Sequence, residues 1–180
     1  MQTMTEKLIS NRIIIRIFTK EFLSEKYVSW LNDKEVTKYS EQRHCVHSYE
    51  TCKDYFESFI DSDNIFFAII NRKNSEHIGN ISVTIDINNK IADVAIMIGE
   101  KEYWGQGFGK EAWSMVVQKL LSMHEIRKVT AGTMSINYPM LKLIKDSGMV
   151  VECTKKFHFL YNGEEVDIIY ASIFSKAYSQ

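Results

Sequence analysis

The sequence is poor in proline and cysteine and has no long apolar run. Its one proline and eight glycines in 180 residues form no stretch typical of a flexible linker. We therefore expect a single domain over residues 1–180, a length that can bury a substantial core. No apolar run reaches the roughly 20 residues that a membrane-spanning helix needs. The first ten residues, MQTMTEKLIS, lack the apolar region of a secretory signal.

Charge of either sign is not in excess, and the few cysteines form no CxxC pair. With 22 basic and 23 acidic residues the net charge is −1, so we expect neither a nucleic acid nor a membrane as partner. Cys45, Cys52 and Cys153 are odd in number and scattered, which favours reduced thiols and a cytoplasmic location. His44 and His47 lie near two of them, but the spacing does not match a structural zinc site, and we expect no metal.

The spacing of apolar residues predicts an alternation of strands and helices. We expect strands at 12–18, 65–70, 77–87, 91–98, 128–133, 150–161 and 166–174. We expect helices at 19–31, 48–60, 108–124 and 137–146, with Thr19 and Ser48 as N-caps of the first two. Asn162-Gly163 is a strong hairpin signal. This order predicts an α/β (α+β) fold, a mixed twisted sheet of about seven strands with helices on both faces.

A glycine cluster between a predicted strand and the longest predicted helix is the most informative segment. It reads Tyr103-Trp104-Gly105-Gln106-Gly107-Phe108-Gly109-Lys110. Glycine permits positive φ and close approach of a ligand, and a helix start offers N–H groups and partial positive charge. Together these favour a phosphate site, although a simple tight turn has the same composition. Neither nucleotide motif fits, because Lys110 replaces the last glycine of GxGxxG, and Trp104 and Glu111 break the P-loop pattern.

The segment IADVAIMIGEKEYWGQGFGKEAW resembles the central motif of the GNAT acetyltransferase superfamily. More narrowly, it is similar to the branch of the ribosomal-protein-alanine N-acetyltransferases, whose members carry a YWGxGY/FxxEA run. Looser matches are Asn137 before a helix ending in KDSGM, the Asn162-Gly163 turn with its flanking strands, the strand from Arg12 to Phe18, and the run WLND at residues 30–33. The resemblance covers nearly the whole chain and implies a sheet whose middle strands splay apart.

This resemblance implies acetyl-CoA as co-substrate and a defined set of residues that contact it. The pyrophosphate would rest on backbone amides of the glycine loop, and the pantetheine arm would pair with the preceding strand as an added strand does. Asn137 matches an asparagine that contacts the cofactor arm, and it suits a helix N-cap equally well. The implied cofactor residues are Met97, Ile98, Trp104, Gly105, Gln106, Gly107, Phe108, Gly109, Lys110 and Asn137.

Three positions depart from the family pattern. The broad family has Gln or Arg where Trp104 stands, although the narrower branch accepts Trp. Many members carry a tyrosine, as acid for the departing thiolate, where this chain has Ile144, and the branch often has serine where it has Met140. The chain therefore lacks both familiar acids, which keeps open a non-catalytic CoA-binding sensor or structural protein.

Acetyl transfer requires a neutral amine, a donor for the oxyanion and a proton or positive environment for the thiolate. A backbone N–H near Ile98 is our candidate donor. Asp93, on the strand that would carry the pantetheine, is the candidate general base; the alternative is an ordinary solvent-facing strand residue. Tyr138 and Ser135 are candidate acids.

The predicted function is transfer of an acetyl group to a primary amine by direct attack in a ternary complex. The acceptor stays open between a protein N-terminus, an amino sugar and a small amine. Glu164, Glu165 and Asp167 in the last predicted hairpin either attract a cationic acceptor or form a solvated turn. We expect a monomer or a homodimer.

Overall fold

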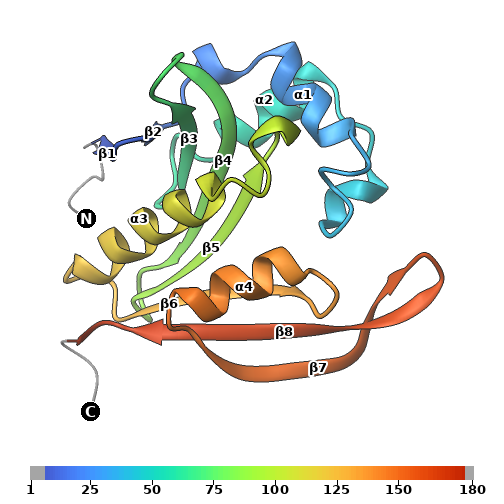
Figure 1. The fold of residues 1–180 in the computed structure, drawn as a ribbon. Coiled ribbons are helices and arrows are strands. Elements are labelled where there is room, and N and C mark those ends of the chain that lie inside the picture. Colours follow the sequence, from blue (N-terminus) through green and yellow to red (C-terminus); the bar gives the residue numbers. More distant parts are fainter. Residues whose placement is uncertain (1–6, 177–180) are drawn as a thin grey trace. The chain divides into compact units, whose positions relative to one another are not determined.

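The computed structural model describes residues 7–176, which form an α+β fold with a mixed sheet (Figure 1). The strand order is β1-β2-β3-β4-β5-β6-β8-β7. Residues group into two compact units, Met1–Thr84 with Ile96–Val116, and Ile85–Ala95 with Val117–Gln180. The fold class predicted from the sequence is confirmed, and the prediction of one domain over 1–180 stays a prediction.

The elements follow the chain with these bounds. Strands are β1 (Leu8–Ile9), β2 (Ile13–Ile17), β3 (Ile65–Asn71), β4 (Glu76–Asp86), β5 (Ile91–Ile98), β6 (Lys128–Met134), β7 (Val150–Tyr161) and β8 (Glu164–Phe174). The α-helices are α1 (Glu25–Asn32), α2 (Tyr49–Glu57), α3 (Phe108–Ser122) and α4 (Tyr138–Asp146). Short 3₁₀ turns are η1 (Lys20–Phe22), η2 (Glu41–His44) and η3 (Lys101–Tyr103).

The first unit is built on antiparallel strands β1 to β4, with β3 at their centre. Every residue of β3, sequence IFFAIIN, is buried, as expected of a strand covered on both faces. Ile15 of β2 lies opposite Ile69 on one side, and Ile81 of β4 lies opposite Phe67 on the other, where the register shifts once, between Ile69 and Ile70. The apolar run that predicted this strand therefore also places it at the centre of the unit.

The prediction of one helix from Thr19 was wrong. Thr19 has extended backbone angles and makes no capping bond with its side chain; its hydroxyl donates to Glu21 at 2.8 Å instead. The chain forms the short turn η1, and α1 begins only after Ser24, whose hydroxyl accepts the N–H of Tyr27 at 3.3 Å. The N-cap predicted at Ser48 is confirmed, and Thr51 completes a capping box at the start of α2.

An aromatic cluster forms the core under α1 and α2. Phe18 lies at its centre, with ring centroids 4.5 Å from Phe66 and 5.4 Å from Tyr27. Its buried members are Phe18, Phe22, Leu23, Tyr27, Val28, Trp30, Cys52, Phe66, Ala68 and Ile70. Offset and tilted ring pairs of this kind stabilise a core beyond their buried area.

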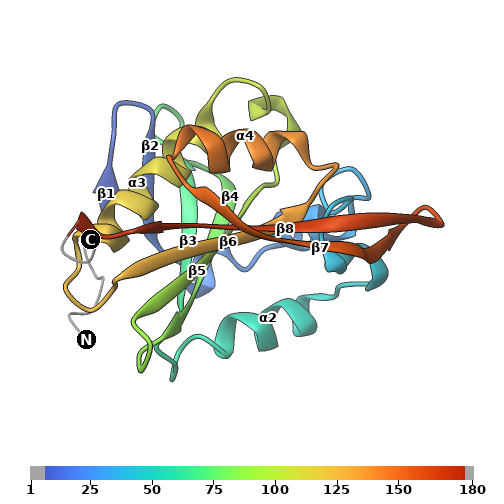
Figure 2. The same ribbon diagram turned by 90° about the horizontal axis from the view of Figure 1, so that it is seen from below.

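The second unit contains the β6–β8–β7 ladder with α4, and β5 joins it in parallel. Ile91, Ala92 and Asp93 of β5 pair with Lys128, Val129 and Thr130 of β6. β8 runs antiparallel to both β6 and β7, and Figure 2 shows the long β7–β8 hairpin in side view. This hairpin turns at Asn162 and Gly163, whose φ angles of 52° and 83° confirm the predicted two-residue turn.

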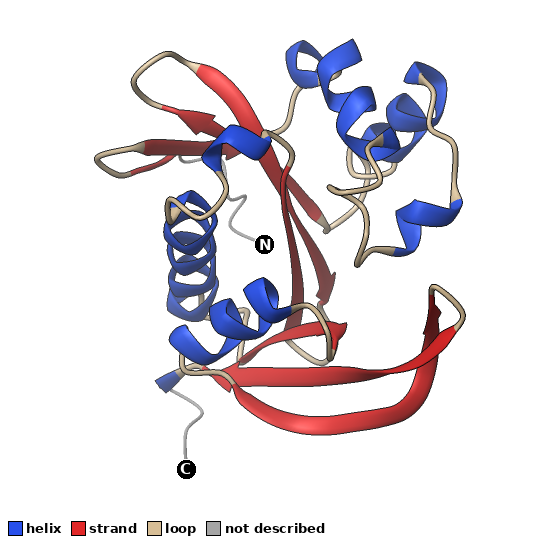
Figure 3. Ribbon diagram, turned by 45° about the vertical axis from the view of Figure 1, so that its right-hand side comes forward, coloured by secondary structure: helices blue, strands red, loops and turns tan. Residues whose placement is uncertain are grey.

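The β7–β8 hairpin bends before its turn, as Figure 3 shows. The register shifts between Lys155 and Phe159, and Phe157 has a positive φ of 51°. Asp167 holds this bulge, accepting the Phe157 N–H at 3.0 Å and pairing with Lys156 at 2.8 Å. The Asp167 carboxylate is therefore engaged within the hairpin.

Two outcomes complete the comparison with the sequence. β1, with only two residues, was not predicted, because a pair of apolar residues carries no periodicity. Within residues 7–176, no helix combines the length and apolar character needed to cross a bilayer.

Gly99, directly after β5, tests how tightly the first unit packs. A Cβ at this position would overlap the ring of Trp30, so we expect Gly99→Ala to destabilise the fold by about 1–3 kcal/mol. Gly109→Ala is the control, because its Cβ would meet only Ile98, with Cγ1 at 3.4 Å, an ordinary contact. Urea unfolding of both variants without ligand checks this, and equal stabilities would contradict the packing described.

Candidate functional site

The glycine loop joins η3 to α3 and has the backbone angles that glycine permits. Gly105 and Gly107 have φ angles of 72° and 83°, in the left-handed region, and α3 begins at Phe108. N–H groups in the first turn of a helix have no helical acceptor, and the helix dipole adds partial positive charge. The loop predicted from sequence therefore combines positive φ angles with a helix start, as a phosphate site of this kind requires.

Side-chain bonds hold the loop against the end of β5. The indole N–H of Trp104 donates to the carbonyl of Ile98 at 2.8 Å, and the Gln106 side chain donates to the carbonyl of Glu102. Tyr103 packs edge-on against Phe108, with ring centroids 5.0 Å apart. Trp104, Gln106 and Phe108, all predicted to contact the cofactor, thus also give the loop its shape.

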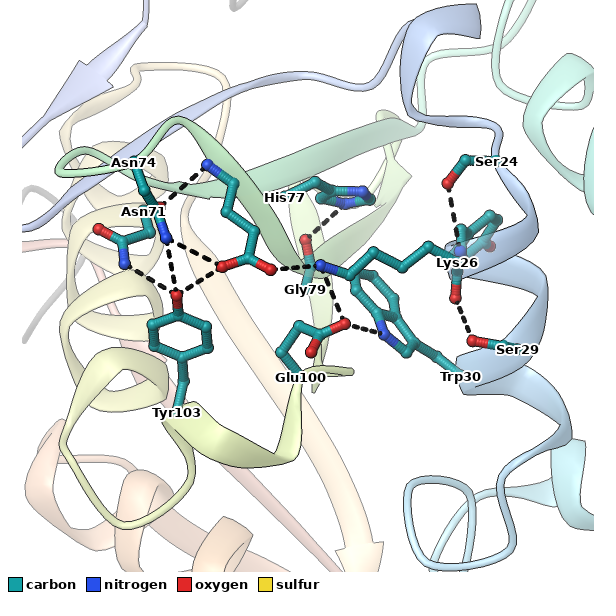
Figure 4. Close-up of polar contacts among 12 residues, drawn as sticks. Ser24, Lys26, Ser29, Trp30, Asn71, Asn74, His77, Gly79, Glu100 and Tyr103 are labelled. Atoms are coloured by element: carbon teal, nitrogen blue, oxygen red, sulfur yellow. Dashed lines mark hydrogen bonds and ion pairs between the residues drawn. The ribbon is translucent and has the colours of Figure 1, made fainter.

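A polar network fixes the segment just before the loop to α1 and β4 (Figure 4). The Trp30 indole donates to Glu100 at 2.8 Å, and the Lys26 ammonium lies 3.0 Å from the same carboxylate and 2.6 Å from Glu76. The Tyr103 hydroxyl donates to Glu76 at 2.6 Å. Burial lowers the pKa of Lys26, but the two carboxylates outweigh it and raise that pKa overall.

Two acidic residues of this network, together with Glu102, form a group that could hold a metal ion. Carboxylate oxygens of Glu76, Glu100 and Glu102 lie within 4.8 Å of one another. The Lys26 ammonium already pairs with two of the three, which reduces the negative charge available to a cation. The prediction that the protein uses no metal stays a prediction. Cys52, from the cluster considered before α2, is buried in the aromatic core.

His77 lies beside this network and packs among aromatic rings in tilted and edge-on contacts. Its Nε2 is 3.1 Å from the Gly79 carbonyl and 2.8 Å from Asn80 Oδ1, and two acceptors require the proton on Nε2. Its ring centroid lies 4.8 Å from that of Trp30 and 4.9 Å from that of Phe22. Burial lowers the pKa of His77 from 6.5 to about 4, so the imidazole is neutral at physiological pH.

Neutral His77 makes stability depend on pH in a defined window. Between pH 6.5 and about 4 the unfolded chain binds a proton that the folded chain does not, so stability falls as pH falls through this range. One proton corresponds to a slope of about 1.4 kcal/mol per pH unit. We expect His77→Gln to reduce the slope of unfolding free energy against pH. His158→Gln, at an exposed position of β7, is the control, and identical slopes in wild type and His77→Gln would contradict the assignment.

Asp93 lies in the second unit, at the third residue pair of the parallel β5–β6 register. The Thr130 hydroxyl donates to its carboxylate at 2.6 Å. The side chain reaches solvent, yet burial of its carboxyl group raises the pKa above the usual range, and the Thr130 bond only partly opposes this. A carboxylate with a raised pKa is better matched to accepting a proton near neutral pH.

The other residues predicted in this unit surround the start of α4. Asn137 is its N-cap, accepting the Met140 N–H at 3.3 Å and donating to the Thr133 hydroxyl at 3.0 Å. The N-cap role is therefore confirmed. Tyr138, in the first turn, is 73% exposed. Ser135 donates its N–H to the Asp167 carbonyl, which fixes its backbone beside β8.

The structure thus places the predicted residues in two groups. Met97, Ile98 and the loop 104–110 belong to the first unit, and Asp93, Ser135, Asn137 and Tyr138 to the second. Ile144, where the family often has an acid, is 3% exposed and packs in the core. The sequence did not reveal the Lys26–Glu76–Glu100 network, because its members lie far apart in the chain and have no motif spacing.

Comparisons with known proteins identify the family. Residues 12–150 match the acetyltransferase (GNAT) domain, and the chain belongs to this family, a family of acyltransferases. The resemblance seen in the sequence is therefore confirmed.

The chain is also similar to three particular proteins. An N-acetyltransferase 9-like protein from Caenorhabditis briggsae is 25% identical over 133 residues, 67% of this chain; the chain spans 66% of that relative's length. The structure of a spermidine N-acetyltransferase from Vibrio cholerae, in complex with CoA and spermine, superimposes with a TM-score of 0.82, 17% identity and coverage of 92% and 97% of the two chains. The structure of a ribosomal-protein-S5-alanine acetyltransferase from Vibrio fischeri superimposes with a TM-score of 0.82 and 15% identity, and the match covers 97% of this chain and 100% of that chain.

Proposed function

We propose that the protein transfers the acetyl group of acetyl-CoA to a primary amine by direct attack in a ternary complex. The glycine loop carries this proposal. Its left-handed glycines precede a helix start, in a chain of the GNAT family. Amides of residues 105–110 would receive the pyrophosphate.

The pantetheine arm would pair with the backbone of Met97 and Ile98, as in β-augmentation. Trp104 already donates to the Ile98 carbonyl, so the arm would compete with the indole for that acceptor or use the neighbouring N–H. Asn137 would contact the arm through hydrogen-bonding positions of its side chain that the N-cap bond to Met140 and the bond to Thr133 do not use.

Asp93 would take the proton of the attacking amine, directly or through water. Its raised pKa supports this role, as does its position on the strand that also carries Met97 and Ile98. Tyr138, exposed at the start of α4, supplies the better candidate acid for the thiolate, and Ser135 the second. The thiolate is weakly basic, so proximity of the two reactants provides much of the rate without a dedicated acid.

The acceptor is a protein N-terminus, an amino sugar or a small amine. Two of the similar proteins are named after acceptors of these classes: spermidine is a small amine, and the alanine of ribosomal protein S5 belongs to a protein. Among the acidic residues considered for attracting a cation, Asp167 is held by Lys156, whereas Glu164 and Glu165 are exposed at the start of β8. We also propose a cytoplasmic location, supported by three unpaired cysteines.

A second candidate is a CoA-binding sensor without catalysis. It is favoured by one observation, the burial of Ile144 where the family often has an acid. The two candidates differ in turnover. The enzyme releases CoA thiol only when a suitable amine is added, whereas the sensor binds CoA and releases none.

Thermal unfolding with added acetyl-CoA tests the loop. A ligand that binds only the folded form at 100 times its Kd stabilises by about 2.7 kcal/mol, so the wild type should show a clear rise in Tm. Gly107→Ala should lose most of this rise, because φ 83° disfavours a Cβ and the backbone must shift. Gly163→Ala is a matched control, since Gly163 has the same φ of 83° in the β7–β8 turn and carries equal strain. No stabilisation of wild type would remove the proposal.

Asp93→Asn separates catalysis from stability. We expect turnover with a responsive amine to fall at least about tenfold, the lower range for a lost general base, with little change in KM for acetyl-CoA. Because the folded-state pKa is raised, ionised Asp93 disfavours the fold as pH rises through that pKa, so the variant should be more stable at pH 7. The variant is measured by CoA release and by unfolding.

Asp86→Asn is the control, and its expected change in stability at pH 7 is opposite in sign to that of Asp93→Asn. Hydrogen bonds from Asn89 lower the pKa of Asp86, so its removal should reduce stability at pH 7 and leave turnover unchanged. Unaltered turnover in Asp93→Asn would exclude Asp93 as the base.

A further inference from the structure

Arg12, the residue before β2, contacts the glycine loop although it lies more than 90 positions away in the chain. Its Nη1 donates to the carbonyl of Gln106 at 2.9 Å, and its Nε donates to Glu111 at 2.6 Å. The guanidinium carbon lies 4.7 Å from the centroid of the Phe108 ring. The planar guanidinium therefore contacts the loop and the first turn of α3 at three residues, Gln106, Phe108 and Glu111.

Glu111 fixes this guanidinium in place. Its carboxylate accepts from Arg12 and from the hydroxyl of Ser10, and Ser10 in turn accepts the N–H of Ile13 at 3.1 Å. Burial raises the pKa of Glu111, but the bonds from Ser10 and Arg12 outweigh it and hold that pKa below its ordinary value. Glu111 is thus ionised at neutral pH and balances the charge of Arg12. Arg12 therefore acts on the loop by orienting its backbone more than by adding net positive charge.

The bond to Gln106 determines where the next N–H points. The Gln106 carbonyl and the Gly107 N–H belong to one planar trans peptide, in which they point in opposite directions. With the carbonyl held toward Arg12, the Gly107 N–H is directed away from it. A Cβ on Gly107 would lie 3.4 Å from Nη2 of Arg12, which places the guanidinium against this peptide.

We infer that Arg12 is a positioning residue that orients the Gln106–Gly107 peptide, so that the Gly107 N–H is presented to the pyrophosphate of the CoA donor. The inference rests on the proposed function and extends it to a residue outside the loop. In this role Arg12 acts through the loop backbone, by its bond to the Gln106 carbonyl. Lysine should not replace it, because an ammonium cannot bond Glu111 and Gln106 in the fixed geometry of a guanidinium fork.

Two acetyl donors distinguish the positioning role of Arg12 from a general structural effect of its substitution. Acetyl-CoA carries the pyrophosphate, whereas acetyl-pantetheine has the same thioester arm without it. We expect Arg12→Lys to weaken CoA binding at least about tenfold by calorimetry, a typical loss for one charge-assisted contact. KM for acetyl-CoA should rise with kcat at saturation unchanged, and kcat/KM for acetyl-pantetheine should equal that of wild type.

Arg16→Lys is the matched control. Arg16 lies four residues on, near the end of β2, pairs with Glu21 and stacks over Phe22 at 4.6 Å, so it repeats the ion pair and the ring contact without touching the loop. It should leave both donors unaffected. If Arg12→Lys fails to fold, Glu111→Gln replaces it, because that variant keeps Arg12 but removes the charge that anchors it. The weakening of donor binding should again be confined to CoA and acetyl-CoA, with acetyl-pantetheine unaffected.

The outcomes separate the two claims. Wild type that binds no CoA overturns the proposed function, whatever Arg12 does. If wild type binds CoA and Arg12→Lys binds it equally, or loses activity equally with both donors, the positioning role is overturned. A loss confined to the donor that carries the pyrophosphate supports it.

Discussion

The contact of the Trp30 ring with the backbone of Gly99 is the constraint on which the candidate site depends. No side chain separates ring and backbone, so α1 approaches the end of β5 as closely as van der Waals contact permits. The indole N–H then reaches Glu100, the next residue, and Glu100 pairs with Lys26 of the same helix. The chain consequently leaves β5 in one direction only, and the glycine loop starts from a fixed point.

Four carboxylates of the described residues show two opposite electrostatic surroundings. Glu76, Glu111 and Asp167 each lie against a cation or a hydrogen-bond donor, and their pKa values are lowered. They therefore stay charged and tie segments together. Asp93 has only the Thr130 hydroxyl, and burial raises its pKa. The group proposed for catalysis thus differs from these three in that its surroundings disfavour the anion, as expected where function and stability compete.

Features encoded by neighbouring residues were predictable, and those encoded by distant ones were not. The buried run of β3, the Ser48 capping box and the Asn162-Gly163 turn each depend on residues within a few positions. The first helix was misplaced because both Thr19 and Ser24 suit an N-cap, and only packing of the aromatic cluster selects Ser24. The loop was found from its glycines, but its supports were not. Arg12 and Glu111 are separated by about a hundred residues, and neither has a distinguishing spacing.

The glycines of this region satisfy requirements of two different kinds. At Gly99 the requirement concerns volume, because any side chain would occupy the space of the Trp30 ring. At Gly105 an added Cβ would meet nothing within 4 Å, and only the φ of 72° excludes other residues. That requirement concerns handedness, since an amino acid of the opposite chirality adopts this angle without strain. Position 99 therefore limits how large a residue can be, whereas position 105 limits only which mirror form the backbone accepts.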